Sequence, residues 1–105
     1  MNLQMNQNSD LKSAVDQPRF TSTQGQYLAF IDAYSRVHGY PPAEAELQRY
    51  FQVTPPSVHQ MILTLERLGF IRRTPRAARS IKVLVSPEHL PRLQPLPVKS
   101  SVQRY

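Results

Sequence analysis

The chain has no cysteine in its 105 residues, only three glycines and no long hydrophobic run. The lack of cysteine excludes disulfides, thiolate zinc ligands and cysteine nucleophiles, and it fits a reducing compartment. No segment approaches the roughly 18 consecutive apolar residues of a membrane span, and the first ten residues lack the basic and apolar regions of a secretion signal. We therefore expect one small soluble intracellular domain, too small for a large multilayer enzyme.

Acidic residues are nearly absent from the C-terminal part of the chain. Residues 1–66 carry four basic and six acidic groups, whereas residues 67–105 carry nine basic groups and a single acid, Glu88. The formal net charge of the whole chain is +6. Clustered lysine and arginine favour a polyanionic partner, because their binding to phosphates releases counterions. A solvated basic face or tail is the alternative explanation.

No grouping of residues typical of catalysis or metal binding occurs. The three histidines, His38, His59 and His89, have no partner at the i, i+4 spacing of a metal-ligand pair. Glu44 and Glu46 are two residues apart and point to different faces of a helix, and no glycine-rich phosphate loop or Ser/His/Asp set is present. We expect no enzyme activity, no cofactor, no metal and no small-molecule substrate.

Hydrophobic spacing and capping residues predict three helices. The first begins among the hydroxyls of residues 21–23 and ends at Gly39, which can adopt the left-handed conformation that ends helices. The second covers residues 43–51 and has a weak cap. The third is opened by Thr54 and two prolines and runs to Gly69. The core is predicted to contain Tyr27, Phe30, Ile31, Tyr34, Leu47, Phe51, Val58, Ile62, Leu65, Ile71, Ile81 and Val83.

After Gly69 the apolar period changes from helical to alternating. Residues 70–74 and 80–85 are predicted to be the strands of a hairpin, joined by a loop at 75–79. Prolines at 87, 91, 95 and 97 predict that the residues from 86 onward form an extended tail without another element. The predicted organisation is a flexible arm at 1–19, a domain at 20–86 and a proline-rich tail at 87–105.

This order of elements is that of a winged helix-turn-helix, a mainly α fold with a small β-hairpin. In such a fold the third helix enters the major groove of DNA, and the hairpin, or wing, lies on the backbone or in the minor groove. The wing here carries five cations without an acid. The sequence therefore predicts a protein that binds double-stranded DNA.

Residues 20–84 resemble the N-terminal DNA-binding domain of LexA-type repressors. The resemblance rests on Gly39-Tyr40-Pro41-Pro42, on Thr54-Pro55-Pro56-Ser57-Val58-His59, on Leu65 to Ile71 and on Ala78-Arg79-Ser80-Ile81. It implies a sequence-specific transcription regulator of the repressor type, cytoplasmic and associated with the nucleoid. The segment 65–71 also resembles winged repressors of the MarR type, so it supports the superfamily more than the family.

The resemblance and the chemistry of the side chains together give candidate DNA contacts. Base contacts are expected from polar side chains of the third helix, because Gln binds adenine and Ser or His can bind several base edges. These candidates are Ser57, His59, Gln60 and, more weakly, Thr64. Backbone or wing contacts are expected from Thr54, Arg67, Arg72, Arg73, Arg76, Arg79 and Lys82, with Arg76 and Arg79 at the wing tip as the best candidates.

The sequence also departs from the family pattern. Ala43 stands where the resemblance implies a Ser or Thr cap, and the turn before the third helix is one residue shorter than in the best-known member, so no operator sequence is transferred. Full-length members carry a dimerisation and self-cleavage domain, which is not expected within these 105 residues; homodimerisation stays open. The alternatives are a winged-helix module or mobile-element accessory protein whose basic face binds a protein, and an RNA-binding protein.

Overall fold

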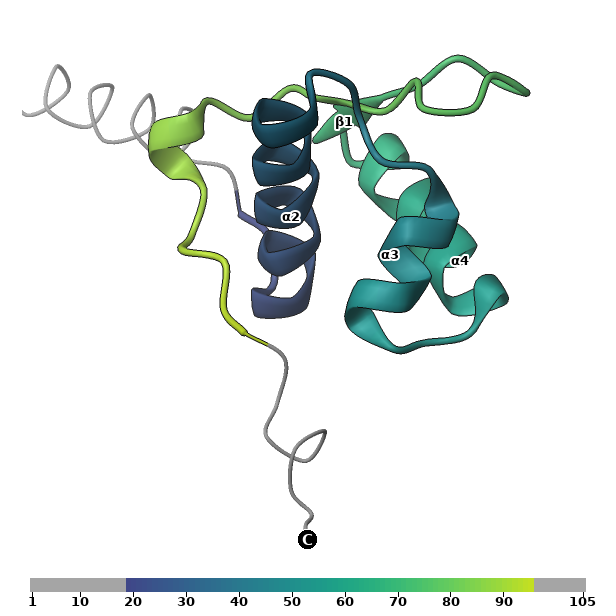
Figure 1. Cartoon of the computed structure of the whole chain (residues 1–105). Coiled ribbons are helices and arrows are strands. Elements are labelled where there is room, and N and C mark those ends of the chain that lie inside the picture. Colours follow the sequence, from purple (N-terminus) through teal and green to yellow (C-terminus); the bar gives the residue numbers. More distant parts are fainter. Residues whose placement is uncertain (1–18, 96–105) are drawn as a thin grey trace, which may run out of the picture.

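The computed structural model describes residues 19–95. Its elements, in chain order, are α2 (Ser22–His38), α3 (Glu44–Phe51), α4 (Pro55–Arg67), β1 (Ile71–Arg72), β2 (Lys82–Val83) and the short 3-10 helix η1 (Pro87–His89). Figure 1 shows α3 and α4 on one side of α2, with the β1–β2 loop extending above them. The mainly α fold with a small hairpin, a winged helix-turn-helix, is confirmed. The predicted flexible arm at 1–19 lies almost wholly outside the described residues.

The ends of α2 are fixed by the residues that predicted them. The Thr21 hydroxyl accepts a hydrogen bond from the Gln24 amide at 3.1 Å, and the Gln24 side chain accepts one from the Thr21 amide at 2.9 Å. This reciprocal pair satisfies two amides that the helix leaves unpaired. At the other end, Gly39 adopts the left-handed conformation (φ 80°), and its amide donates to the Ser35 carbonyl. The predicted start and end are confirmed.

Capping contacts also fix the start of α3 and the turn between α3 and α4. Ala43 has no side-chain oxygen, and the Glu46 carboxylate accepts a hydrogen bond from the Ala43 amide at 2.6 Å. Gln52 ends α3 in the left-handed region (φ 56°). Two residues later, the Thr54 hydroxyl accepts from the Ser57 amide, so the cap predicted for α4 is confirmed. The tight turn thus sets the angle at which α4 leaves α3.

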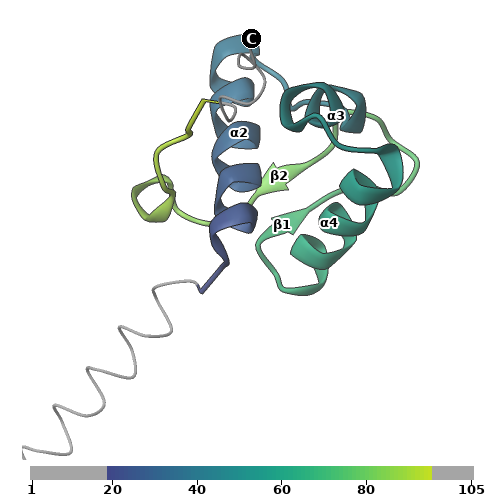
Figure 2. The same cartoon turned by 90° about the horizontal axis from the view of Figure 1, so that it is seen from below.

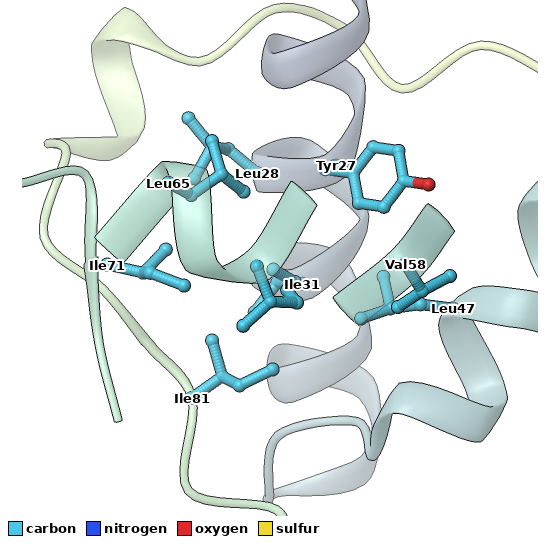
Figure 3. Close-up of a cluster of buried hydrophobic side chains, with 9 residues drawn as sticks. Tyr27, Leu28, Ile31, Leu47, Val58, Leu65, Ile71 and Ile81 are labelled. Carbon is cyan, nitrogen blue, oxygen red and sulfur yellow. The ribbon is translucent and has the colours of Figure 1, made fainter. Parts of the chain in front are cut away.

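The core is one cluster of apolar side chains contributed by all three helices and the hairpin. Figure 3 shows the side chains of α2, α3, α4 and the sheet converging on one interior. Leu28, which the predicted core omits, is completely buried, whereas Val37 at the end of the predicted α2 stripe is 77% exposed. The buried members of the cluster are Tyr27, Leu28, Ile31, Leu47, Val58, Ile62, Leu65, Ile71 and Ile81.

Aromatic rings join α2 to α3. Tyr27 stacks on Phe51 with ring centroids 4.1 Å apart, and Phe30 stacks on Tyr50 at 4.4 Å. Stacked pairs of this kind add about 0.5–1.5 kcal/mol to the burial of their area. The α3–α4 unit is thereby held against the long helix.

The hairpin is shorter than its sequence predicts. Each strand has only two residues, paired antiparallel with Ile71 opposite Val83 and Arg72 opposite Lys82. The predicted strand residues 70, 73–74, 80–81 and 84–85 lie outside the ladder. Ile81 is nevertheless buried, and Val83 and Val85 are half-buried, as the alternation predicts. The predicted extents are wrong because side-chain contacts, described below, shape the long loop between the strands.

Residues 87–95, here called the strap, pack along α2. They begin on the side of α2 that faces away from α3 and α4, as Figure 1 and Figure 2 show, and their end reaches Tyr50 of α3. The Gln26 side chain donates to the Arg92 carbonyl and accepts from the Gln94 amide, while the Tyr50 hydroxyl donates to the Gln94 carbonyl. The prediction of a tail without another element is therefore wrong for residues 87–89, which form η1. The part of the predicted tail from 96 onward lies outside the described residues.

Gly25 lets the strap approach α2 closely. A Cβ atom at this position would lie 3.0 Å from a ring carbon of Phe20 and 3.0 Å from Cγ of Pro91. Glycine inside a helix costs about 0.8–1.0 kcal/mol relative to alanine. The close contact of the two flanking side chains offsets this cost.

Gly25→Ala is therefore expected to destabilise the protein by about 1 kcal/mol, although alanine ordinarily stabilises a helix by a similar amount. The free energy of unfolding in urea measures the effect, with Thr23→Ala in the same exposed turn as the control. Adding Pro91→Ala should restore part of the loss. A stabilised Gly25→Ala protein would contradict the close packing.

Candidate nucleic-acid interface

The N-terminal half of α4 presents polar side chains to solvent. Ser57, His59 and Gln60 are all exposed, while Val58 between them is completely buried and anchors the helix to the core. The side-chain amide of Gln60 makes no hydrogen bond within residues 19–95, so both of its ends are available to a partner. Three of the four predicted base-contacting residues are thus accessible to solvent at the start of α4.

Thr64 is less accessible than the other three candidates. It is half-buried, one turn beyond Gln60. Leu63, which the sequence reasoning missed, is 37% exposed and lies one helical turn after His59 and Gln60. Its i, i+4 spacing from His59 is the signal that places it on the same face.

A carboxylate of α3 orients His59. The Nδ1 atom of His59 lies 3.3 Å from Oε2 and 3.4 Å from Oε1 of Glu44. A neutral imidazole that donates from Nδ1 keeps Nε2 as a hydrogen-bond acceptor. Glu44 is therefore a functional candidate that sequence reasoning did not identify.

The side chain of Ser80 closes the wing loop. Its hydroxyl accepts from the Thr74 amide at 3.0 Å and lies within hydrogen-bonding distance of the Thr74 and Ala77 carbonyls, at 3.1 and 2.9 Å. Arg76 and Arg79 both adopt the left-handed backbone region, with φ of 65° and 58°. Non-glycine residues rarely occupy this region, so the loop depends on its side-chain contacts.

Two of the six predicted backbone-contacting cations are engaged inside the domain. Arg73 donates from Nε to Glu66 of α4 at 3.1 Å, and Arg79 donates to Glu46 of α3 at 3.1 Å. The sequence predicts Arg79 as a wing-tip contact, but its guanidinium folds back onto the connection between α2 and α3. The other four are exposed and form no ion pair within residues 19–95: Arg67, Arg72, Arg76 and Lys82.

Arg72 and Lys82 stand directly opposite each other on the solvent face of the hairpin. Like charges at directly opposed positions of an antiparallel pair are destabilising by a few tenths to about 1 kcal/mol. No acidic side chain pairs with either cation among the described residues. The arrangement weakens a two-residue sheet and concentrates positive charge at the base of the wing.

The Glu46 carboxylate is the centre of the polar contacts between α3 and the wing. Partial burial raises the pKa of Glu46. Hydrogen bonds from the Ala43 amide and the Arg79 guanidinium, together with the charges of Arg79 and Arg49, lower this pKa by a larger amount. The pKa of Glu46 thus lies below its ordinary value. Hydrogen bonds to Tyr34 and Glu46 also raise the pKa of Arg79, which stays charged throughout the accessible pH range.

Comparison of the sequence with known protein families gives a match. Residues 17–80 match the family model of the LexA DNA binding domain, and this stretch includes α2, α3, α4 and β1. The chain belongs to the LexA DNA-binding domain family. The resemblance inferred from the motifs is confirmed. Lys82, β2 and the strap lie beyond the stretch that the LexA family model matches.

Curated relatives extend the similarity. The LexA repressor of Thermosipho africanus is 34% identical over 82 residues, which are 78% of this chain and 39% of the relative. The LexA repressor of Magnetococcus marinus is 40% identical over 66 residues, 63% of this chain and 27% of the relative. The chain thus spans about two fifths or less of the length of these LexA repressors.

The LexA-type domain contains neither a metal-binding cluster nor a membrane span in its described part. Residues 19–95 bring together no group of three or more His, Cys, Asp or Glu side chains suited to a metal ion. None of their helices combines the length and hydropathy needed to cross a bilayer.

The lowered pKa of Glu46 gives this LexA-type domain a defined acid sensitivity. The unfolded chain takes up the proton first, near the ordinary value of 4.5, so the contribution of Glu46 is complete above that pH and is lost as the pH falls through the folded pKa. The difference in melting temperature between wild type and Glu46→Gln should therefore shrink from pH 6 to pH 3. At neutral pH, the Glu46 carboxylate should contribute less than about 1 kcal/mol to the free energy of unfolding. Glu88→Gln, in η1, is the control and should show no such trend.

Ser80→Ala should loosen the wing loop without affecting the core. The Thr74 amide loses its acceptor and should exchange with solvent faster, whereas amides of α2 should keep their protection. Ser86→Ala, at an exposed serine without a capping bond, serves as the control. Equal protection of Thr74 in the variant and the wild type would show that other contacts hold the loop.

Proposed function

We propose that the chain is a sequence-specific transcription regulator that binds double-stranded DNA, with α4 in the major groove and the wing on the backbone or in the minor groove. The proposed role is binding, without catalysis. Three observations support this proposal: membership of the LexA DNA-binding domain family, the exposed polar side chains of α4 and the exposed cations of the wing.

Sequence readout is assigned to α4. The side chains of Ser57, His59 and Gln60 are exposed on the first two turns, and the major groove presents a different pattern of donors and acceptors for each base pair. Gln60 can form two hydrogen bonds with adenine. When His59 is neutral and its Nδ1 donates to Glu44, its Nε2 offers an acceptor to a base amino group.

The opposed cations Arg72 and Lys82 are the observation that carries the proposal. Their repulsion is unfavourable in the free domain, and a phosphate lying between them would relieve it. Arg67, at the end of α4, and Arg76, in the wing loop, add exposed positive charge near this pair in the sequence. We assign these four residues, with Thr54 at the start of α4, to contacts with the DNA backbone.

Repression is the proposed outcome of binding, because the relatives that the chain matches are LexA repressors. A protein that occupies promoter DNA excludes the transcription machinery from it. We also propose that two copies bind one operator, because palindromic sites place two recognition helices about one DNA turn apart. Association with the nucleoid follows from DNA binding.

The test is selection of bound sequences from a random pool of double-stranded DNA by the purified protein at two salt concentrations. An enriched motif is expected, and the number and spacing of its half-sites report whether two copies bind. Salt-sensitive binding without enrichment would contradict sequence-specific regulation. No binding at all would overturn the proposal and favour a protein partner for the basic face.

The roles of α4 and of the wing can be separated by two substitutions. Gln60→Ala should change the preferred base at one position of the selected motif, whereas Arg76→Ala should weaken binding to all sequences. Removal of one phosphate contact lowers the slope of log affinity against log salt by about 0.9. Equal losses on the selected motif and on random DNA for both variants would contradict this division.

Reversing one charge of the opposed pair should affect stability and binding in opposite directions. Lys82→Glu should stabilise the free domain by about 0.2–1 kcal/mol, since Arg72 gains an opposite charge, and should weaken DNA binding at least tenfold. Arg92→Glu in the strap makes the same change in net charge away from the wing and is the control. If both variants lost the same affinity, net charge rather than the wing would determine binding.

A further inference from the structure

We propose that Arg79 is a positioning residue, which fixes the wing against α2 and α3 in the geometry needed for DNA binding and makes no contact with DNA itself. The inference rests on the proposed function, in that the wing is taken to contact DNA. It differs from the expectation drawn from the sequence, in which Arg79 contacts a phosphate or enters the minor groove.

The edge of the Arg79 guanidinium donates to three separate parts of the domain. Nη1 lies 3.3 Å from the Tyr34 hydroxyl of α2 and 3.3 Å from the Pro41 carbonyl in the α2–α3 connection. Nη2 lies 3.1 Å from Oε2 of Glu46 in α3. One side chain of the wing loop is thus tied to two helices and to the segment that joins them, 33 to 45 residues earlier in the chain.

The face of the same guanidinium is also occupied. Its central carbon lies 4.9 Å from the centre of the Tyr40 ring, within the distance of a cation–π contact. Tyr40 is itself 47% exposed and packs edge-on against Tyr34, so the stacking site is at the surface of the domain. The Arg79 side chain is 38% exposed, but its edge and one face are directed into the domain and not toward the wing tip.

The backbone of Arg79 is consistent with a fixed position. Its φ of 58° lies in the left-handed region, which is unfavourable for a residue with a side chain. The side-chain contacts offset this cost. On the opposite side of the loop, the ion pair between Arg73 and Glu66 attaches the wing to α4.

The two attachments hold the loop at both ends and leave Arg76 exposed between them. A cavity of about 280 Å³ separates this loop from the start of α3, lined by Pro42, Ala43, Glu44 and residues 76–81 among others. Because no apolar core fills this space, the polar contacts of Arg79 determine the distance between the wing and α3. The wing tip should therefore move when these contacts are lost.

Substitution of the acceptor Glu46 separates a positioning role from a direct DNA contact. If Arg79 contacted a phosphate, Glu46→Gln would release it and remove a nearby negative charge, so DNA binding would become tighter. If Arg79 positions the wing, the same substitution weakens its anchor and DNA binding becomes weaker. The two roles predict opposite signs for one variant.

The experiment measures affinity for the selected DNA motif across several salt concentrations for Glu46→Gln, Arg79→Lys and Tyr40→Leu. We expect each variant to bind about three- to tenfold more weakly, at an unchanged salt slope. Arg79→Lys keeps the charge but loses the planar fork and most of the stacking. Arg49→Ala is the matched control, since Arg49 is an exposed partner of the same Glu46 oxygen. Arg76→Ala is the positive control for a lower slope.

A second measurement follows exchange of the Ala77 amide, which donates to the Thr74 carbonyl, in the free protein at a temperature where every variant is folded. Faster exchange is expected in Glu46→Gln and Arg79→Lys, but not in Arg49→Ala. A lower melting temperature without a change in affinity or exchange would indicate a role in stability alone and would overturn the proposal.

The outcomes distinguish this inference from the proposed function. Tighter binding by Glu46→Gln, together with wild-type binding by Arg79→Lys, would overturn the positioning role while DNA binding stands. Failure of the wild type to bind any DNA would overturn the proposed function, and with it the role of Arg79 in DNA binding. The exchange measurement would then still show whether Arg79 holds the loop.

Discussion

The buried contact of α2 with the hairpin is the constraint on which the rest of the domain depends. Two-residue strands have no independent stability, so β1 and β2 exist because Ile71 and Ile81 join the cluster that contains Leu28 and Ile31 of α2. The same cluster includes Ile62 and Leu65 of α4. The base of the wing and α4 are therefore positioned by one small core, whereas the wing loop beyond it is held by the polar contacts of Arg79 and Arg73.

Outside this core, two carboxylates form ion pairs with some cations of the wing and leave the others unpaired within residues 19–95. Glu66 and Glu46 each bind one arginine of the wing, and these two arginines attach the loop to α4 and α3. The cations that have no acidic partner among residues 19–95 lie at the surface instead. A strongly basic segment thereby serves two purposes, since part of its charge shapes the loop and the remainder faces outward.

Local signals made most of the fold predictable. Thr21, Gly39 and Thr54 cap helices through contacts with residues three or four positions away, and such contacts can be read from the sequence. The strap and the orientation of Arg79 depend on contacts 33 to 68 residues apart, which no local pattern encodes. The predicted core omits Leu28 because it follows the aromatic residues of α2. The buried side of α2 is displaced from the line of these aromatic residues and includes Leu28. Helical spacing correctly predicted that Ser57, His59 and Gln60 are exposed, whereas Thr64 is half-buried.

The strap also has a mechanical consequence. It returns the chain to the beginning of α2, where Gln94 binds Gln26 and Pro95 lines a cavity with Ser22 and Thr23. The first turn of α2 and the end of the strap thus line the same small pocket. A force applied between them would peel the strap from α2 one contact at a time and would load the central core only after the strap had detached.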